Sequence, residues 1–305
     1  MGDEFSQYHP LVNFLWCALV LLFSMCLLHP VCLAIALCAA LCYSGFLDGA
    51  RALGRRCLCY LPLLLAAAAL NAAFNHGGIT TLCYLPSGNP LTLEALRFGA
   101  AMAALLLAVL TEFACFQRLL GTDKFVYLFG RAAPVLSLLL SMTLRFVPRF
   151  AAHLRTVREA QRALSGAPEH GLHRVRSAVR AFSAAVTWAL ENAVDTADSM
   201  CARGYGLPGR SAYNIYRWER RDRAALLWLL LCGAGVAAGW VGGCFAWRYV
   251  PVARFAALTP RSALAAVAYL ALCLTPLALS LYAARHETIC KLQYNNIMKR
   301  QDKRT

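Results

Sequence analysis

Residues 11–46 read LVNFLWCALVLLFSMCLL-HP-VCLAIALCAALCYSGF. Two apolar runs, residues 11–28 and 31–46, flank the dipeptide His29-Pro30. A helix that crosses a membrane needs about 20 predominantly apolar residues, within a range of about 17–25. Because proline does not continue the helix before it, this pattern predicts a tight hairpin of two short spanning helices.

Four more apolar runs of this kind follow along the chain. They cover residues 60–74, 96–116, 224–247 and 262–284. The sequence therefore predicts an all-α, polytopic membrane protein with about six spans. A further apolar stretch, residues 132–150, contains Arg145 and Arg149. We interpret it as an interfacial or partly inserted helix.

The composition is both strongly hydrophobic and basic. Hydrophobic residues make up 60% of the chain and charged residues 15%, and the net charge is +15. Soluble domains average about 45–50% apolar and about 25% charged residues. High hydrophobicity excludes a disordered chain, and the apolar runs argue against a plain soluble enzyme and against a nucleic acid partner.

The basic residues cluster between particular runs. With a cytoplasmic N-terminus and six spans, the cytoplasmic pieces are residues 1–10, 47–59, 117–223 and 285–305. They hold 26 of the 30 Lys and Arg residues, 17 of them in 117–223. Cytoplasmic loops carry the excess of positive charge, so this orientation is favoured. Counting 132–150 as a seventh crossing would destroy the agreement.

The expected organisation has four parts. N-terminal transmembrane helices occupy residues 1–121, and a cytoplasmic or interfacial region occupies 122–223. C-terminal transmembrane helices follow in 224–286, and a basic cytoplasmic tail completes the chain in 287–305.

The cytoplasmic region contains two helices separated at Gly166-Ala-Pro168. The second helix is expected from near Glu169 towards Arg203, and Gly204 and Gly206 end it. Its apolar positions recur every three or four residues, which predicts one face of an α-helix. These positions are Leu172, Val175, Val179, Phe182, Val186, Ala189, Ala193, Ala197 and Met200. Such a face must be covered by lipid, by a neighbouring helix or by a partner.

The end of this helix reads ADSMCARGYG over residues 197–206. Ala202 and Gly204 allow close approach of another backbone, and Arg203 can donate two parallel hydrogen bonds to a carboxylate or to carbonyl groups. The simplest interpretation is an arginine that complements the helix dipole. A docking contact is the alternative.

The order of these features resembles the transmembrane T component of energy-coupling factor (ECF) transporters, the family that includes the Q subunit of cobalt uptake systems. The family's hallmark is a pair of Ala-Arg-Gly motifs that end two cytoplasmic coupling helices, and the second motif is present as Ala202-Arg203-Gly204. Residues 144–148 read LRFVP, like the family's Leu-Arg-Phe-x-Pro segment. The resemblance covers about residues 9–223.

The first motif departs from the family pattern. Ala160-Gln161 is present, but Leu164 and Ser165 stand where the family has Arg and Gly. Arg162 lies two residues earlier, so either Arg162 substitutes for the missing arginine or the second motif carries most of the coupling.

The resemblance implies a subunit without a catalytic site, cofactor or metal. Two cytoplasmic ATP-binding-cassette subunits would contact Ala160, Gln161, Arg162, Ala202, Arg203 and Gly204. Arg145 and Pro148 would shape the coupling region. A small membrane-embedded S component would bind a vitamin or metal ion, in the plasma (inner) membrane of a prokaryote. The chain contains no Gly-Lys dipeptide, and therefore no phosphate-binding P-loop of its own.

The alternative is a self-sufficient secondary carrier of a small solute. Carriers place ionisable groups inside the membrane, and Glu112 and Arg145 are the candidates here. Glu112 falls near the cytoplasmic end of its run, where an interfacial position accounts for it. The 14 cysteines form neither a disulfide framework nor a zinc pattern.

Overall fold

The computed structural model describes residues 4–74, 80–84, 90–130, 133–165, 171–208, 216–245 and 259–302. The chain forms two compact units, which we describe separately. The first, unit 1, comprises Met1–Gly121 and Tyr216–Thr305, and the second, unit 2, comprises Thr122–Ile215.

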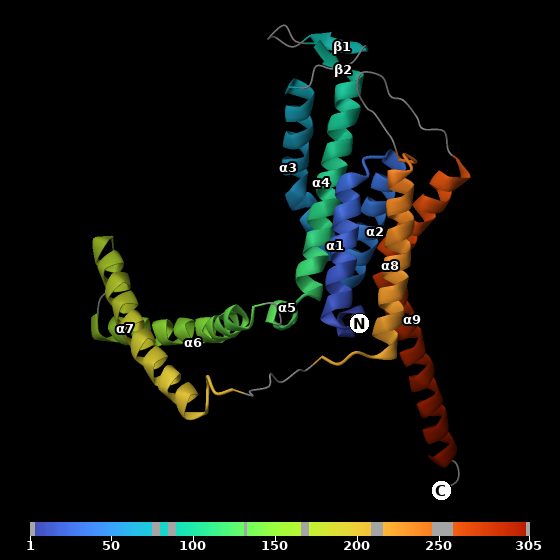
Figure 1. Ribbon diagram of the computed structural model, residues 1–305. Coiled ribbons are helices and arrows are strands. Elements are labelled where there is room, and N and C mark those ends of the chain that lie inside the picture. Colours follow the sequence, from blue (N-terminus) through green and yellow to red (C-terminus); the bar gives the residue numbers. More distant parts are fainter. Residues whose placement is uncertain are drawn as a thin grey trace. The chain divides into compact units, whose positions relative to one another are not determined.

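Unit 1 is a bundle of helices preceded by a short 3-10 helix (Figure 1). Its elements are η1 (Glu4–Gln7), α1 (Pro10–Cys26), α2 (Pro30–Asp48), α3 (Ala50–Phe74), β1 (Thr81–Tyr84), β2 (Pro90–Thr92), α4 (Leu93–Leu119), α8 (Arg220–Val241) and α9 (Pro260–Asp302). Unit 2 contains α5 (Thr122–Gly130), α6 (Pro134–Ser165) and α7 (Leu172–Ala202).

The chain is an all-α polytopic membrane protein. Helices α2, α3, α4, α6, α8 and α9 are each long and apolar enough to cross a membrane within the described residues. Helix α1 is shorter, at 17 residues, and lies at the lower limit for a span. Residues 132–150, expected as an interfacial stretch, belong from Pro134 onwards to the 32-residue α6. Length and composition alone would also let that helix span a bilayer.

The hairpin predicted at His29-Pro30 is present. A histidine followed by a proline also starts α1. His9 and His29 are the N-cap residues of α1 and α2, and each is followed by proline in the first turn. The Nδ1 atom of each histidine accepts the backbone N–H two residues later, at 3.3 Å. Each imidazole therefore occupies the place of the usual Ser, Thr or Asp cap.

Residues 47–59, expected as one of the cytoplasmic pieces, are largely helical. Helix α2 runs to Asp48, Gly49 turns the chain with φ +83°, and α3 begins at Ala50. Only glycine adopts such a conformation without strain, so a single residue makes the turn. The following arginines are good helix formers, and α3 therefore starts ten residues before its apolar run.

A small antiparallel hairpin, not predicted from the sequence, joins α3 to α4. Thr92 ends β2 and caps α4, because its Oγ1 accepts the Ala95 N–H at 3.3 Å. Glu94 then accepts the Thr80 hydroxyl at 2.6 Å. Figure 1 shows α3 and α4 extending towards this hairpin beyond α1 and α2.

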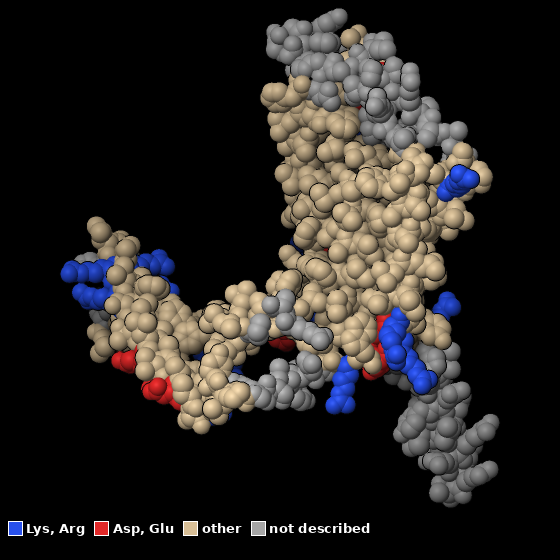
Figure 2. Space-filling model, in the orientation of Figure 1, with Lys and Arg blue, Asp and Glu red and all other residues tan. Residues whose placement is uncertain are grey.

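The core of unit 1 lies among α1, α2, α4, α8 and α9. Its largest fully buried side chains include Tyr269, Leu229, Leu272 and Val236. Helices α8 and α9 pack closely, because a Cβ atom at Gly239 would lie only 2.5 Å from the Ala265 Cβ. In Figure 2 the visible face of unit 1 is almost entirely uncharged along its middle, as lipid contact requires.

Candidate functional site

Helix α7 packs on α6 through a narrow face of small residues. Ala181 and Ala185 are fully buried, and Ser177 Oγ donates a hydrogen bond to Gln161 Oε1 on α6 at 3.2 Å. These α7 residues are four apart, so they share one side of the helix. Gln161, expected to contact an ATPase, is therefore engaged in the α6–α7 interface.

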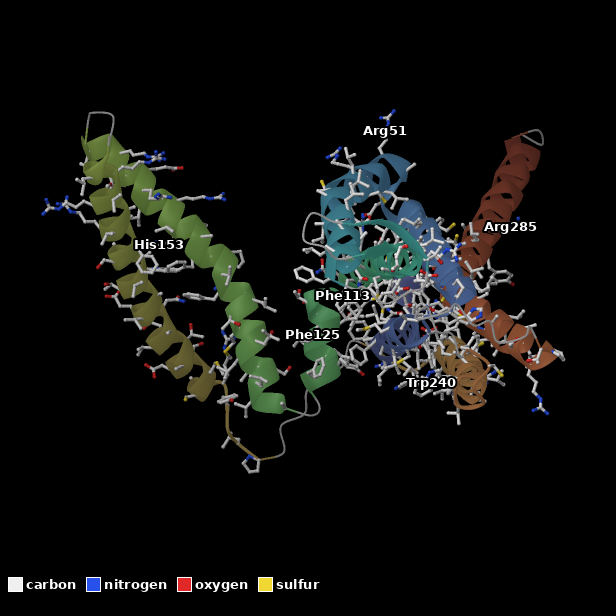
Figure 3. All side chains as sticks on the ribbon, turned by 90° about the horizontal axis from the view of Figure 1, so that it is seen from above. Arg51, Phe113, Phe125, His153, Trp240 and Arg285 are labelled. Atoms are coloured by element: carbon white, nitrogen blue, oxygen red, sulfur yellow. The ribbon has the colours of Figure 1, made fainter. Side chains whose placement is uncertain are left out.

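Aromatic rings extend the same interface. The indole of Trp188 stacks on His153 with ring centroids 4.2 Å apart, and on Phe146 at 5.8 Å. Figure 3 shows His153 between the two helices. Phe146 belongs to the LRFVP segment, so one function of that segment is to hold α7 in place.

The apolar stripe predicted on α7 does not make this contact. Its first four members are exposed, between 56% for Phe182 and 88% for Leu172, whereas the next member, Val186, is half-buried. The exposed apolar face consists of Leu172, Val175, Val179, Phe182, Leu190 and Val194. Helix α7 thus has two apolar faces, a small one that binds α6 and a large one that is uncovered.

Ala202-Arg203-Gly204 forms the C-terminal cap of α7. Gly204 has φ +80°, its N–H donates to the Cys201 carbonyl at 3.0 Å, and the Tyr205 N–H donates to the Met200 carbonyl at 3.0 Å. This pair of hydrogen bonds is the Schellman motif, which requires a left-handed residue at the position of Gly204. The expected helix end at Arg203 is confirmed, whereas the expected start near Glu169 and the break at 166–168 lie outside the described residues.

The side chains around the cap are open to solvent. Ala202 and Arg203 are exposed, and Arg203 forms no ion pair within the described part of the chain. Three acidic residues, also exposed, precede it on the helix: Glu191, Asp195 and Asp198. Acidic groups near a helix C-terminus oppose the helix dipole, so helix stability does not explain their presence. Figure 2 shows acidic and basic residues at opposite ends of α7.

The first-motif residues lie near the end of α6. Ala160 and Arg162 are exposed and Leu164 is 88% exposed, while Gly166 falls outside the described residues. Arg145 and Pro148 are also exposed. Pro148 lies inside α6, where its missing N–H leaves one helical carbonyl without its usual partner.

One structural site passed unnoticed in the sequence. The Asp48 carboxylate, 4% exposed, pairs with Arg56 and with Arg118. Asp48 ends α2, Arg56 lies in the second turn of α3 and Arg118 lies in the last turn of α4. One buried carboxylate therefore joins three helices at the same end of the bundle. Arg118 lies far from Asp48 in the sequence, so no local pattern predicts this cluster.

Glu112, for which an interfacial position was expected, is buried among the helices of unit 1. Only 7% of the residue is exposed. Ser24 Oγ donates to its Oε1 atom at 3.0 Å and lies 2.9 Å from the Tyr269 hydroxyl.

Neither a search for metal-binding groups among the described residues nor a comparison with known proteins indicates a further site. No group of three or more His, Cys, Asp or Glu residues in the described ranges could hold a metal ion, and the cysteines described there with their side chains are free thiols. No protein-family model matches the chain, and no curated protein is significantly similar to it.

Proposed function

We propose that this chain is the transmembrane energy-coupling subunit of an ECF-type ABC importer. The observation that carries the proposal is the exposed Ala202-Arg203-Gly204 cap at the end of α7, a helix held by the LRFVP and Ala-Gln segments of α6. The family pattern thus coincides with a physical pair of helices. The proposal rests on this coincidence and on the membrane-helical fold.

The energy for uptake would come from other chains. A P-loop needs a Gly-Lys dipeptide, which this sequence lacks. Two cytoplasmic ATP-binding-cassette subunits would therefore supply the work. The exposed Arg203 guanidinium suits a groove that offers carboxylate or carbonyl oxygens, and the nearby acidic residues suit basic groups around that groove.

The shape of α7 supports a mechanical role. A helix of 31 residues is about 46 Å long, and its cap fixes the direction of the chain at the point where an ATPase would bind. The exposed apolar face of α7 would be covered by the membrane-embedded S component, which binds the vitamin or metal ion. In this proposal the fold lies in the plasma membrane of a prokaryote, with both termini in the cytoplasm, as the distribution of Lys and Arg favours.

The test is assembly and uptake with candidate ATPases and an S component. Arg203→Glu should abolish or strongly reduce co-purification of the ATPases, because a mispaired charge in a docking groove costs several kcal/mol, on the order of 2–5. Arg176→Glu, at the other exposed end of α7, is the matched control and should assemble normally. Unchanged assembly and uptake of Arg203→Glu would overturn the proposed contact.

A glycine pair separates docking from backbone strain. Gly204 and Gly206 have φ values of +80° and +92°, so alanine at either position is strained by about 1 kcal/mol. Only Gly204 belongs to the Ala-Arg-Gly motif. Gly204→Val should therefore impair assembly more than Gly206→Val does, and equal effects would show that assembly does not depend on the cap that Gly204 forms.

The second candidate function is a self-sufficient secondary carrier, and the buried Glu112 favours it. An ionisable residue inside a membrane bundle marks a functional site by default. Liposomes that contain this chain alone distinguish the two functions. Solute uptake without ATPases that is lost in Glu112→Gln would establish the carrier and exclude the coupling subunit.

A further inference from the structure

The chain re-enters unit 1 at a compact polar junction. Residues 216–219 precede α8 without regular structure, and they meet the residues that precede α1. Figure 1 shows the N-terminal end of α1 beside the lower end of α8. We call the contacts of Tyr8 and His9 with Trp218, Arg221 and Asp222 the α1–α8 junction.

The Asp222 carboxylate accepts hydrogen bonds from the N-terminal ends of two helices. Its Oδ1 atom accepts the His9 N–H at 3.2 Å, and its Oδ2 atom accepts the Glu219 N–H at 3.0 Å. These are the N-cap residues of α1 and α8, and they lie far apart in the sequence. The negative charge sits at two helix N-termini, where the helix dipoles stabilise it. Asp222 and His9 are only 2% and 3% exposed.

Two contacts of aromatic rings add to the hydrogen bonds of the junction. The His9 imidazole lies on the Trp218 indole with ring centroids 4.1 Å apart and planes inclined by 20°. The Arg221 guanidinium lies over the Tyr8 ring at 5.3 Å. Burial lowers the pKa of His9, and the Asp222 charge opposes that effect. A neutral imidazole keeps Nδ1 free to accept the Leu11 N–H.

A simple helix cap needs fewer contacts. Glu219 and Asp222 already form a reciprocal capping box at the start of α8. The additional bond to His9 and the ring stack contribute nothing to that box. They tie the segment before α8 to α1, so that the two helices start from a common point.

We propose that the α1–α8 junction fixes residues 216–219 to the start of α1, so that α1 and α8 move together when the cytoplasmic helices are displaced. Trp218 and Asp222 are thus positioning residues for energy coupling, and this role rests on the proposed function. Without the anchor, the irregular residues 216–219 would absorb the movement.

The first experiment does not depend on transport. Hydrogen exchange of the full chain in detergent is compared between the native protein and Asp222→Asn. If the carboxylate joins both helices, peptides covering residues 4–13 and 216–224 should both exchange about tenfold faster in the variant. Asp123→Asn, in the first turn of α5, is the control. Faster exchange in 216–224 alone would overturn the junction, since Asp222 would then be a local cap.

The second experiment measures solute taken up per ATP hydrolysed in the reconstituted complex. Trp218→Ala should keep complex formation and ATP hydrolysis but lower this ratio at least about fivefold, and Trp218→Tyr should restore it because a ring can still stack. Trp240→Ala, at the labelled position on the periphery of unit 1 (Figure 3), is the control. An unchanged ratio in Trp218→Ala would overturn the anchoring role.

The two experiments separate this inference from the proposed function. If the native chain binds no ATPases, the proposed function fails, and the exchange experiment still tests the junction. If the native complex transports and Trp218→Tyr is as defective as Trp218→Ala, ring stacking is not what anchors the segment.

Discussion

Helices α1 and α7 bury their surfaces in opposite ways. In α1, large apolar and polar side chains are enclosed by neighbouring helices, among them Val12, Trp16 and Asn13. In α7, the only fully buried residues within the described range are Ala181 and Ala185, and the large apolar side chains are exposed. Unit 1 therefore has a core of large enclosed side chains, whereas the contact between α6 and α7 fully encloses only small ones on α7. Both units also expose large apolar side chains, of the kind that lipid or a partner covers.

The largest loss of stability is expected when Gly239, in the core of unit 1, is substituted. Gly239→Leu would force side-chain atoms into Ala265 across the α8–α9 contact, and overpacking of this kind costs about 3 kcal/mol. Thermal unfolding followed with a thiol-reactive fluorophore reports on unit 1, because Cys232 and Cys273 are buried there. Gly235→Ala is the control, since its Cβ would meet Ala268 at an ordinary 3.5 Å. Equal midpoints for the two variants would contradict close packing.

The second largest loss of stability is expected when Asp48 is substituted. Asp48→Asn removes the charge that Arg56 and Arg118 share. Breaking a fully buried pair costs about 3–5 kcal/mol, but both arginines are partly solvated, so we expect about 2 kcal/mol. The same thiol assay measures it. Glu191→Gln, an exposed carboxylate in unit 2, should leave the midpoint unchanged.

A pair of substitutions three residues apart tests α7 itself. Ala185→Leu should loosen the α6–α7 contact by about 1 kcal/mol, because the site is fully enclosed. Phe182→Ser should change stability by less than about 0.5 kcal/mol, as expected for a surface site. Hydrogen exchange in residues 146–161 and 177–190 measures both. If Phe182→Ser speeds exchange as much as Ala185→Leu, the large apolar face is part of the unit 2 core.

The smallest effect should come from pH. Burial lowers the pKa of His9 and of His29, so the unfolded chain binds protons more readily than the folded one. Stability is then fully present above the unfolded pKa of about 6.5 and falls as the pH drops towards the folded value. Unfolding midpoints between about pH 7.5 and about pH 5.5 measure this loss. His9→Asn, which can cap α1 without titrating, should show a weaker pH dependence; an identical slope would exclude His9 as the group responsible.

Features that depend on local sequence were predictable. The apolar runs indicated the helices of unit 1, His29-Pro30 indicated the hairpin, and Gly204 indicated the end of α7, because each signal lies within a few residues of its effect. The role of Ala202-Arg203-Gly204 in docking stays a prediction.

Features that depend on distant packing were not predictable. The apolar stripe on α7 was recognised from the sequence, but which face of α7 packs on α6 was not. Ala181 and Ala185 carry no stronger hydrophobic signal than the exposed valines. The α1–α8 junction joins residues 213 positions apart, and no periodicity reveals such a pair. The burial of Glu112 depends on its contact with Ser24 of α1, which lies 88 positions away in the sequence.

The unequal helix lengths in unit 1 set a condition on the surrounding bilayer. Helix α1, with 17 residues, and α4, with 27, measure about 26 Å and about 40 Å at 1.5 Å per residue. One lies below and the other above the hydrocarbon thickness of about 30 Å. Since Asp48 and Arg118 join α2 and α4 at one end, the surplus length of α4 stands on the hairpin side. A long helix accommodates such a mismatch by tilting, kinking or locally thickening the bilayer, and a short one by thinning it or by oligomerising, so α4 and α1 make opposite demands on the lipid around unit 1.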